Sequence, residues 1–207
     1  MIDLYSSPTP NGRKISIMLE ELSVEYNPIF INLEQKEQFS EDFSKISPSN
    51  KIPVIVDKDN NQTVFESGAI LLYLAKKYKK FLNGDKYWEI IQWVFFQMAY
   101  VGPMLGQAHQ YLFYNPGKSK FAEEKTKGYA KHIYDILDKR LSEQEYFSNE
   151  YSIADIAIWP WTARFERHQV DLNNYPNVLR WYLQISKRPA VIKGYNVVGN
   201  FFEIPKP

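Results

Sequence analysis

The predicted fold depends on residues 47–74, which read SPSNKIPVIVDKDNNQTVFESGAILLYL. The run 51–56 has strand character and carries Pro53 near its start. Because proline has no N–H to give to a ladder, it belongs at a strand entrance or on an edge strand. Asn60-Asn61 then predicts a hairpin turn, and 63–65 a short returning strand. The first part of this stretch therefore predicts an antiparallel pair of strands.

The second part of the stretch predicts a helix that begins at Glu66-Ser67-Gly68. Its apolar residues Ile70, Leu71, Leu74 and Tyr78 keep helical spacing. A strand edge and a helix N-terminus are thus expected at the same end of a small sheet. Such a pair can hold a short, anionic, extended peptide.

The residues before this stretch predict further alternation of strands and helices. A short strand at 2–5 is followed by a loop of turn-forming residues and by a helix with Asn11 as its expected N-cap. The strand at 25–31 contains Pro28 and is expected at an edge, and 35–46 is expected to form a short helix. The predicted order of the first domain is β-α-β-α-β-β-α.

The second half of the chain has helical periodicity throughout, after a break at Asn83-Gly84. Helices are expected at 87–98, 121–141 and 175–187, with an interruption at Gly102-Pro103. Ser152 and Asp155 have the spacing of a capping box and precede an apolar segment that is expected to be buried. After Gly194 there is no periodicity. We predict domains at 1–79 and 87–207, joined by a linker at 80–86.

Composition excludes several classes of function. The 207 residues carry a net charge of +1, which favours neither nucleic acid nor a membrane surface as a partner. The chain contains no cysteine, which excludes a disulfide framework, thiolate metal sites and a protein thiol nucleophile. The three histidines, His109, His132 and His168, lack ligand spacing, so we expect no metal. No signal peptide or membrane span is recognisable, and we expect a cytoplasmic protein.

Three local features could contribute to a binding site, and each has a simpler structural explanation. Thr9 lies in the loop before a helix and Asn11 at the start of that helix, and both can donate hydrogen bonds to a thiolate. In the simpler explanation Thr9 is only a loop residue and Asn11 only a helix cap. A cis Ile52-Pro53 bond could expose the backbone of Ile52 to an extended peptide, or the proline can simply protect an edge. Glu66 and Ser67 could bind an amino-acid head group, or they can be ordinary capping residues.

The combination of these features resembles the cytosolic glutathione transferases, and most closely their bacterial nu class. The similarity rests on YSSPTPNG near the N-terminus, SPSNKIP before the third strand, FESGAILLYL at the third helix and YSIADIA in the second half. It covers essentially the whole chain. It implies a thioredoxin-like α/β N-terminal domain, an all-α C-terminal domain and a homodimer. It also implies glutathione as cosubstrate and glutathione-dependent reduction of disulfides without a protein cysteine.

The resemblance also implies roles for individual residues. Thr9 and Asn11 match the catalytic pair beside the glutathione sulfur. The other implied glutathione-binding positions are Gln38, Lys51, Ile52, Pro53, Glu66, Ser67 and Lys125, of which Lys125 would reach the ligand of the other subunit. Relatives have arginine at that position, and lysine lacks its bidentate geometry.

Alternatives remain at the level of residues and of function. Tyr5, at the end of the first strand, could donate to the thiol as in tyrosine-type transferases, although we expect it to be structural, and Ser6 or Ser7 could replace Thr9. The protein could be a conventional transferase that conjugates glutathione to electrophiles. It could also be a non-catalytic binding or regulatory protein that retains the fold.

Overall fold

The computed structural model describes residues 1–197 and 202–207, and within these it contains two compact units. One comprises Met1–Leu82 with Lys187–Ile204, and the other Asn83–Ser186 with Pro205–Pro207. The prediction placed the whole of 87–207 in one helical domain. In the structure Lys187–Ile204 instead groups with the N-terminal unit.

The first unit is built on a four-stranded sheet with the order β2-β1-β3-β4. The strands are β1 (Ile2–Ser6), β2 (Tyr26–Phe30), β3 (Val54–Asp57) and β4 (Gln62–Phe65). β1 runs parallel to β2 and antiparallel to β3, and β3 and β4 form the predicted hairpin around Asn60-Asn61. Pro28 lies in β2 at the edge, as predicted. Strand β3 begins only after Pro53, later than the sequence suggested.

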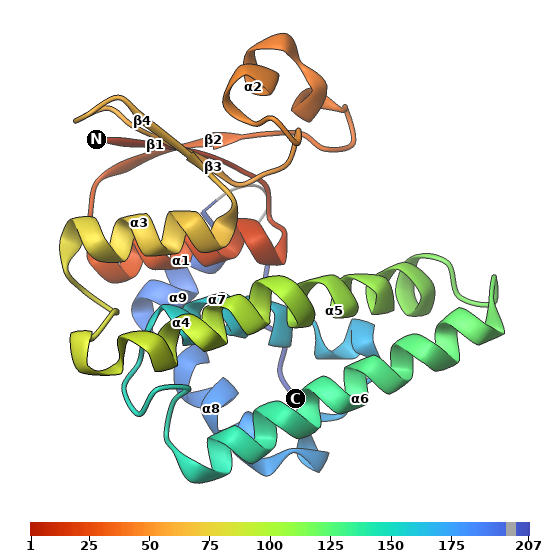
Figure 1. Cartoon of the computed structure of the whole chain (residues 1–207). Coiled ribbons are helices and arrows are strands. Elements are labelled where there is room, and N and C mark those ends of the chain that lie inside the picture. The colour runs from red at the N-terminus through yellow and green to blue at the C-terminus, as the bar shows by residue number, and fades with distance from the viewer. Residues whose placement is uncertain (198–201) are drawn as a thin grey trace. The chain divides into compact units, whose positions relative to one another are not determined.

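Two helices cover one side of this sheet, and a short helix lies on the other side (Figure 1). The covering pair is α1 (Pro10–Leu22) and α3 (Ser67–Tyr78), which pack against each other. The predicted helix at 35–46 is divided into a 3-10 turn, Glu37–Phe39, and α2 (Glu41–Ile46), because the side chain of Ser40 caps α2. The observed order confirms the predicted β-α-β-α-β-β-α fold of the first domain.

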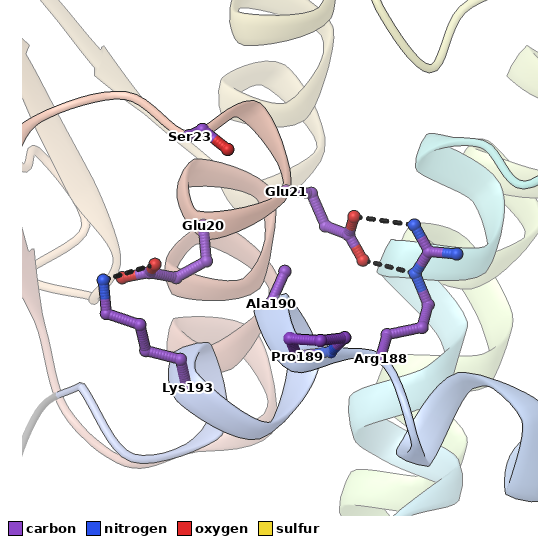
Figure 2. A pocket seen from close by; sticks show the side chains of 7 residues that line it. All are labelled: Glu20, Glu21, Ser23, Arg188, Pro189, Ala190 and Lys193. Atoms are coloured by element: carbon purple, nitrogen blue, oxygen red, sulfur yellow. Dashed lines mark hydrogen bonds and ion pairs between the residues drawn. The ribbon is translucent and has the colours of Figure 1, made fainter.

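A helix that the sequence analysis missed, α9 (Pro189–Tyr195), packs on α1 within the first unit. Figure 2 shows two ion pairs between them, Arg188 with Glu21 at 2.6 Å and Lys193 with Glu20 at 2.8 Å. These four charged side chains line a pocket of about 460 Å³. Because the charges neutralise one another, we interpret this pocket as part of the helix contact and not as a ligand site. The aperiodic tail noted after Gly194 falls partly on residues 198–201, outside the described residues.

The second unit is helical. It contains α4 (Tyr87–Phe96), α5 (Gly102–Ala108), α6 (Lys120–Glu143), α7 (Ile153–Thr162) and α8 (Pro176–Ser186), with short 3-10 and π-helical turns between some of them. A π-helical stretch, Gln97–Val101, separates α4 from α5 just before Pro103. The sequence predicted that the helix would be kinked or would end near this proline. None of the helices in the described ranges is long and apolar enough to cross a membrane.

Helix α7 is the centre of this unit, and every one of its residues is buried. The capping box between Ser152 and Asp155 is present as predicted. The carboxylate of Asp155 also accepts from the backbone N–H of Phe147 at 3.2 Å and from the indole N–H of Trp181 at 2.9 Å. One carboxylate thus both starts α7 and joins it to α8.

Candidate functional site

The first part of the candidate site is the N-terminus of α1, where Thr9 and not Asn11 is the cap. The Thr9 hydroxyl oxygen accepts from the backbone N–H of Gly12 at 3.1 Å. The expected cap at Asn11 was wrong because the helix already begins at Pro10, a residue whose fixed φ suits a first helical position. Asn11 is therefore in the first turn, and it is partly buried. Thr9 keeps its own hydroxyl proton, since the capping bond uses only its oxygen.

The loop before α1 packs tightly against this N-terminus. A Cβ atom added to Gly12 would lie 2.2 Å from the carbonyl oxygen of Ser7 and 2.4 Å from Oγ of Ser6. Ser6 and Ser7 are both buried, and the Ser7 hydroxyl donates to the carbonyl oxygen of Ile31. These contacts direct both serines into the domain, which disfavours the serine alternative for thiol binding.

Tyr5 takes part in a small apolar cluster on the sheet. Its ring centroid is 6.3 Å from that of Phe43, and it packs on the buried group of Ile31, Phe43 and Val54. This packing supports the structural interpretation of Tyr5.

The second part of the site is the turn that leads into β3. The Ile52-Pro53 peptide bond is cis, the isomer that the binding hypothesis supposes. The buried side chain of Ser47 stabilises this turn. Its hydroxyl donates to the carbonyl oxygen of Lys51 at 2.9 Å and accepts from the N–H of Lys51 at 3.0 Å. The side chain of Lys51 is exposed. The main chain of Ile52 thus lies directly before the strand, on a turn fixed by a buried serine.

The third part of the site is the N-terminus of α3. Glu66 precedes the helix with φ 68° and makes no side-chain capping bond, and Ser67 is the first helical residue. The first turn contains no acidic residue, so the positive end of the helix dipole is not neutralised by its own helix. The side chain of Glu66 is exposed, whereas Ser67 is buried. A backbone with donors and positive potential is the local environment that favours a carboxylate.

Sequence analysis missed a buried lysine beside this helix start. The ammonium of Lys14, on α1, donates to the hydroxyl oxygen of Ser67 at 3.2 Å, and Lys14 is 1% exposed. Burial holds the pKa of the Lys14 amine well below its ordinary value, with attraction to Glu66 opposing the shift. A signal was present in the sequence, because Lys14 lies four residues before Met18 and so on the predicted apolar side of α1.

Two predicted residues belong to segments other than the three described so far. Gln38 is in the 3-10 turn, and its amide oxygen is buried without a hydrogen-bond partner among the described residues. Lys125 is exposed on α6 in the second unit, where its ammonium lies 5.7 Å from the ring centroid of Phe121 and 5.8 Å from that of Tyr129. Apart from Lys125, all the predicted site residues, Gln38 among them, belong to the first unit.

Two of the three histidines are closer together than their spacing in the sequence suggested. In the second unit Nε2 of His168 lies 2.9 Å from Nε2 of His109, and the hydroxyl of Tyr134 lies 3.0 Å from Nδ1 of His168. Burial holds the pKa of His109 at about 4 and that of His168 well below its ordinary value. Over residues 1–197 and 202–207, no group of three or more histidine, aspartate or glutamate side chains is arranged to hold a metal ion.

Comparisons with known proteins agree with this geometry. The family model described as Glutathione S-transferase, N-terminal domain, matches residues 1–76, and that described as Glutathione S-transferase, C-terminal domain, matches residues 122–183. The disulfide-bond oxidoreductase YfcG of Escherichia coli (strain K12) is 44% identical over 198 residues, which cover 92% of this chain and 92% of that protein. The chain belongs to the glutathione S-transferase family.

Further relatives of this transferase extend the comparison. The disulfide-bond oxidoreductase YghU of the same E. coli strain is 38% identical over 212 residues, covering 93% of this chain and 73% of that protein. Among solved structures, a glutathione transferase from Pseudomonas putida has a TM-score of 0.90 and 37% identity, covering 95% of this chain and 91% of its own. That crystal structure contains one glutathione disulfide bound per protein subunit. These matches confirm the predicted family and the fold class of the transferase.

Proposed function

We propose that this transferase binds glutathione and catalyses glutathione-dependent reduction of disulfide bonds, with no cysteine of its own. The observation that carries the proposal is the full-length similarity to a disulfide-bond oxidoreductase in a chain that contains no cysteine. Under this proposal the thiols of glutathione supply the reacting sulfur atoms and the electrons.

The first unit offers groups that suit each part of glutathione. The N-terminus of α3 at Ser67 suits the carboxylate of the γ-glutamyl residue, and exposed Glu66 suits its ammonium. The main chain of Ile52 suits the extended cysteinyl unit. The buried amide oxygen of Gln38 can accept from a peptide N–H. Thr9 and Asn11 then donate hydrogen bonds to the sulfur of the cysteinyl unit.

The chemistry needs a thiolate and two exchange steps. Hydrogen bonds from Thr9 and Asn11, with the positive end of α1, favour the glutathione thiolate over the thiol. The thiolate attacks one sulfur of the substrate disulfide, forming a mixed disulfide and releasing the first substrate thiolate, which takes up a proton. A second glutathione thiolate attacks the glutathione sulfur of that mixed disulfide and releases the other substrate thiol. Two glutathione molecules are oxidised to one glutathione disulfide, and one substrate disulfide is reduced to two thiols.

We also propose that the protein is a cytoplasmic homodimer. Three aromatic side chains of the helical unit are strongly exposed, Trp88 at 73%, Phe95 at 61% and Phe121 at 75%. Aromatic residues are enriched in protein interfaces and are costly to leave in water. The absence of cysteine is compatible with a reducing compartment. Light scattering on the purified protein measures the subunit number, and a monomer at micromolar concentration would contradict the dimer.

The experiment that tests the function compares two activities of the same preparation. Reduction of a small hydroxyalkyl disulfide by glutathione is followed through glutathione reductase, and conjugation of glutathione to an aryl chloride is followed separately. We expect reduction to exceed conjugation by roughly 10-fold or more in kcat/KM. Dominant conjugation would identify a conventional detoxifying transferase. Binding of glutathione without either activity would identify a regulatory protein.

The variant Asn11→Ala tests the proposed thiolate site. We expect its disulfide-reductase kcat to fall roughly 10- to 100-fold, as when one donor to a developing anion is lost. The matched control is Asn173→Ala in the second unit, an exposed asparagine that should leave turnover unchanged. Unchanged turnover of the Asn11 variant would remove this residue from the mechanism.

A further inference from the structure

A buried hydrogen bond joins the α3 N-terminus to α1. The ammonium of Lys14 donates to the hydroxyl oxygen of Ser67 at 3.2 Å, and the two residues are 1% and 5% exposed. Burial lowers the pKa of the Lys14 amine, and attraction to the negative charge of Glu66, the residue before Ser67, opposes that shift. A lysine is almost never fully buried without a functional or paired role, because its charge must leave water.

The direction of this hydrogen bond matters for the chemistry of Ser67. In the contact with Lys14, Nζ is the donor and the Ser67 hydroxyl oxygen is the acceptor. Its hydroxyl proton therefore points away from Lys14. A serine held in this way can donate to an anion at the start of the helix, and a hydrogen bond to an ionised acceptor is stronger than one between neutral groups.

We propose that Lys14 is a positioning residue that makes the α3 N-terminus selective for a carboxylate, by orienting the Ser67 hydroxyl and by placing behind it a buried amine that a bound carboxylate keeps protonated. The inference rests on the proposed glutathione function, in which that carboxylate belongs to the γ-glutamyl residue. In this proposal Lys14 contributes to binding of the carboxylate and not to the exchange step.

The position of Lys14 in α1 explains how the two ends of the site are kept in register. Asn11 and Lys14 are three residues apart, so they lie on neighbouring turns of the same face of the helix. In the proposal Asn11 interacts with the sulfur of the ligand and Lys14 acts on its carboxylate. Because both residues belong to one helix, the distance between these two parts of the site is fixed. A ligand must therefore present both groups to use the full site.

The test compares glutathione with an analogue that lacks only the γ-glutamyl α-carboxylate, the tripeptide γ-aminobutyryl-cysteinyl-glycine. Dissociation constants for both are measured by calorimetry on wild type, Lys14→Met and Lys14→Gln. Wild type should bind glutathione about 10- to 100-fold more tightly than the analogue, the range for a hydrogen bond to a charged group. In Lys14→Met this preference should fall to within about threefold, with the affinity for the analogue unchanged. Lys14→Gln keeps a donor without the charge and should retain an intermediate preference.

Kinetics and a control variant separate this role from a structural one. The KM for glutathione should rise in Lys14→Met while kcat at saturating glutathione stays within about twofold of wild type. Lys76→Met removes the same charge from an exposed position of α3 and should behave as wild type. Methionine is apolar and of similar length, so the variant should fold with an unchanged or higher unfolding temperature.

The outcomes distinguish this inference from the proposed function. If wild type binds glutathione but Lys14→Met keeps the preference for the carboxylate, the role of Lys14 is refuted and the function stands. An equal loss of affinity for both ligands would assign Lys14 a structural role only. If wild type does not bind glutathione at all, the proposed function fails, and the inference that rests on it fails too.

Discussion

The Nε atom of Arg13 donates a hydrogen bond of 3.0 Å to the carbonyl oxygen of Tyr195, 182 positions later in the chain. Arg13 is in the first turn of α1, and Tyr195 is the last residue of α9. The bond satisfies one of the carbonyl groups that a helix C-terminus leaves without an intrahelical partner. The guanidinium carbon also lies 3.5 Å from the centroid of the Tyr195 ring. The first unit is therefore completed by a helix from the end of the sequence.

Gly194 allows the close approach of these two helices. A Cβ atom at this position would lie 2.6 Å from Cα of Ile17, which is backbone and cannot move aside. We expect Gly194→Ala to lower the free energy of unfolding by about 2 kcal/mol, the usual range for overpacking, as measured by urea denaturation. Gly128→Ala is the matched control, because that glycine is in α6 with nothing within 4 Å of the added atom. The control should gain about 0.5–1 kcal/mol, and a similar loss in both variants would contradict the packing argument.

The sequence was most informative where local chemistry determines structure. The hairpin around Asn60-Asn61 and the capping box of Ser152 and Asp155 depend on neighbours in the chain, and both were predicted. Helix α9 was missed because it is short and is stabilised by contacts with α1. Those contacts join residues far apart in the sequence, so the local periodicity does not reveal them. Lys14 was missed because a lysine in a helix is normally assigned to a solvated face. The residues that the local pattern misses are thus those whose partners are distant in sequence.

The buried histidine pair predicts that the second unit loses stability in acid. The pKa of His109 is about 4 in the folded protein and about 6.5 when unfolded. Below pH 6.5 the unfolded chain binds more protons than the folded one, so stability falls as the pH decreases from 6.5 toward 4. From pH 7.5 to pH 5, His109 alone should account for a loss of about 2 kcal/mol.

The control for this prediction is His109→Phe, which keeps a ring against Trp161 and cannot be protonated. Asp155 has its pKa raised to about 6 by burial, and such a carboxyl group loses its stabilising contribution as the pH rises, which is the opposite sign. The informative quantity is therefore the difference between wild type and His109→Phe in urea midpoint across the pH series. Parallel curves for the two proteins would contradict the assignment.

Asp155 is expected to be the most sensitive position of the second unit. Its carboxylate accepts from the backbone N–H of Ser152 at 3.0 Å, and from Phe147 and Trp181 as described above. Asp155→Ala leaves these buried donors without an acceptor and should lower the free energy of unfolding by about 3 kcal/mol or more. Asp171→Ala removes a similar contact to the N–H of Asn173 at an exposed site, and it should cost about 1 kcal/mol or less. Equal urea midpoints for the two variants would refute the central role of Asp155.

Thr9 combines a structural and a proposed catalytic role, and two substitutions separate them. Thr9→Ala removes the cap of α1 and should lower the free energy of unfolding by about 1 kcal/mol. It also removes a proposed donor to the glutathione thiolate, so the disulfide-reductase kcat should fall roughly 10-fold or more. Thr9→Ser keeps the hydroxyl in place and should restore both quantities to near the wild-type values. If Thr9→Ala loses stability and keeps its kcat, Thr9 is a cap alone, and stabilisation of the thiolate rests with Asn11 and the dipole of α1.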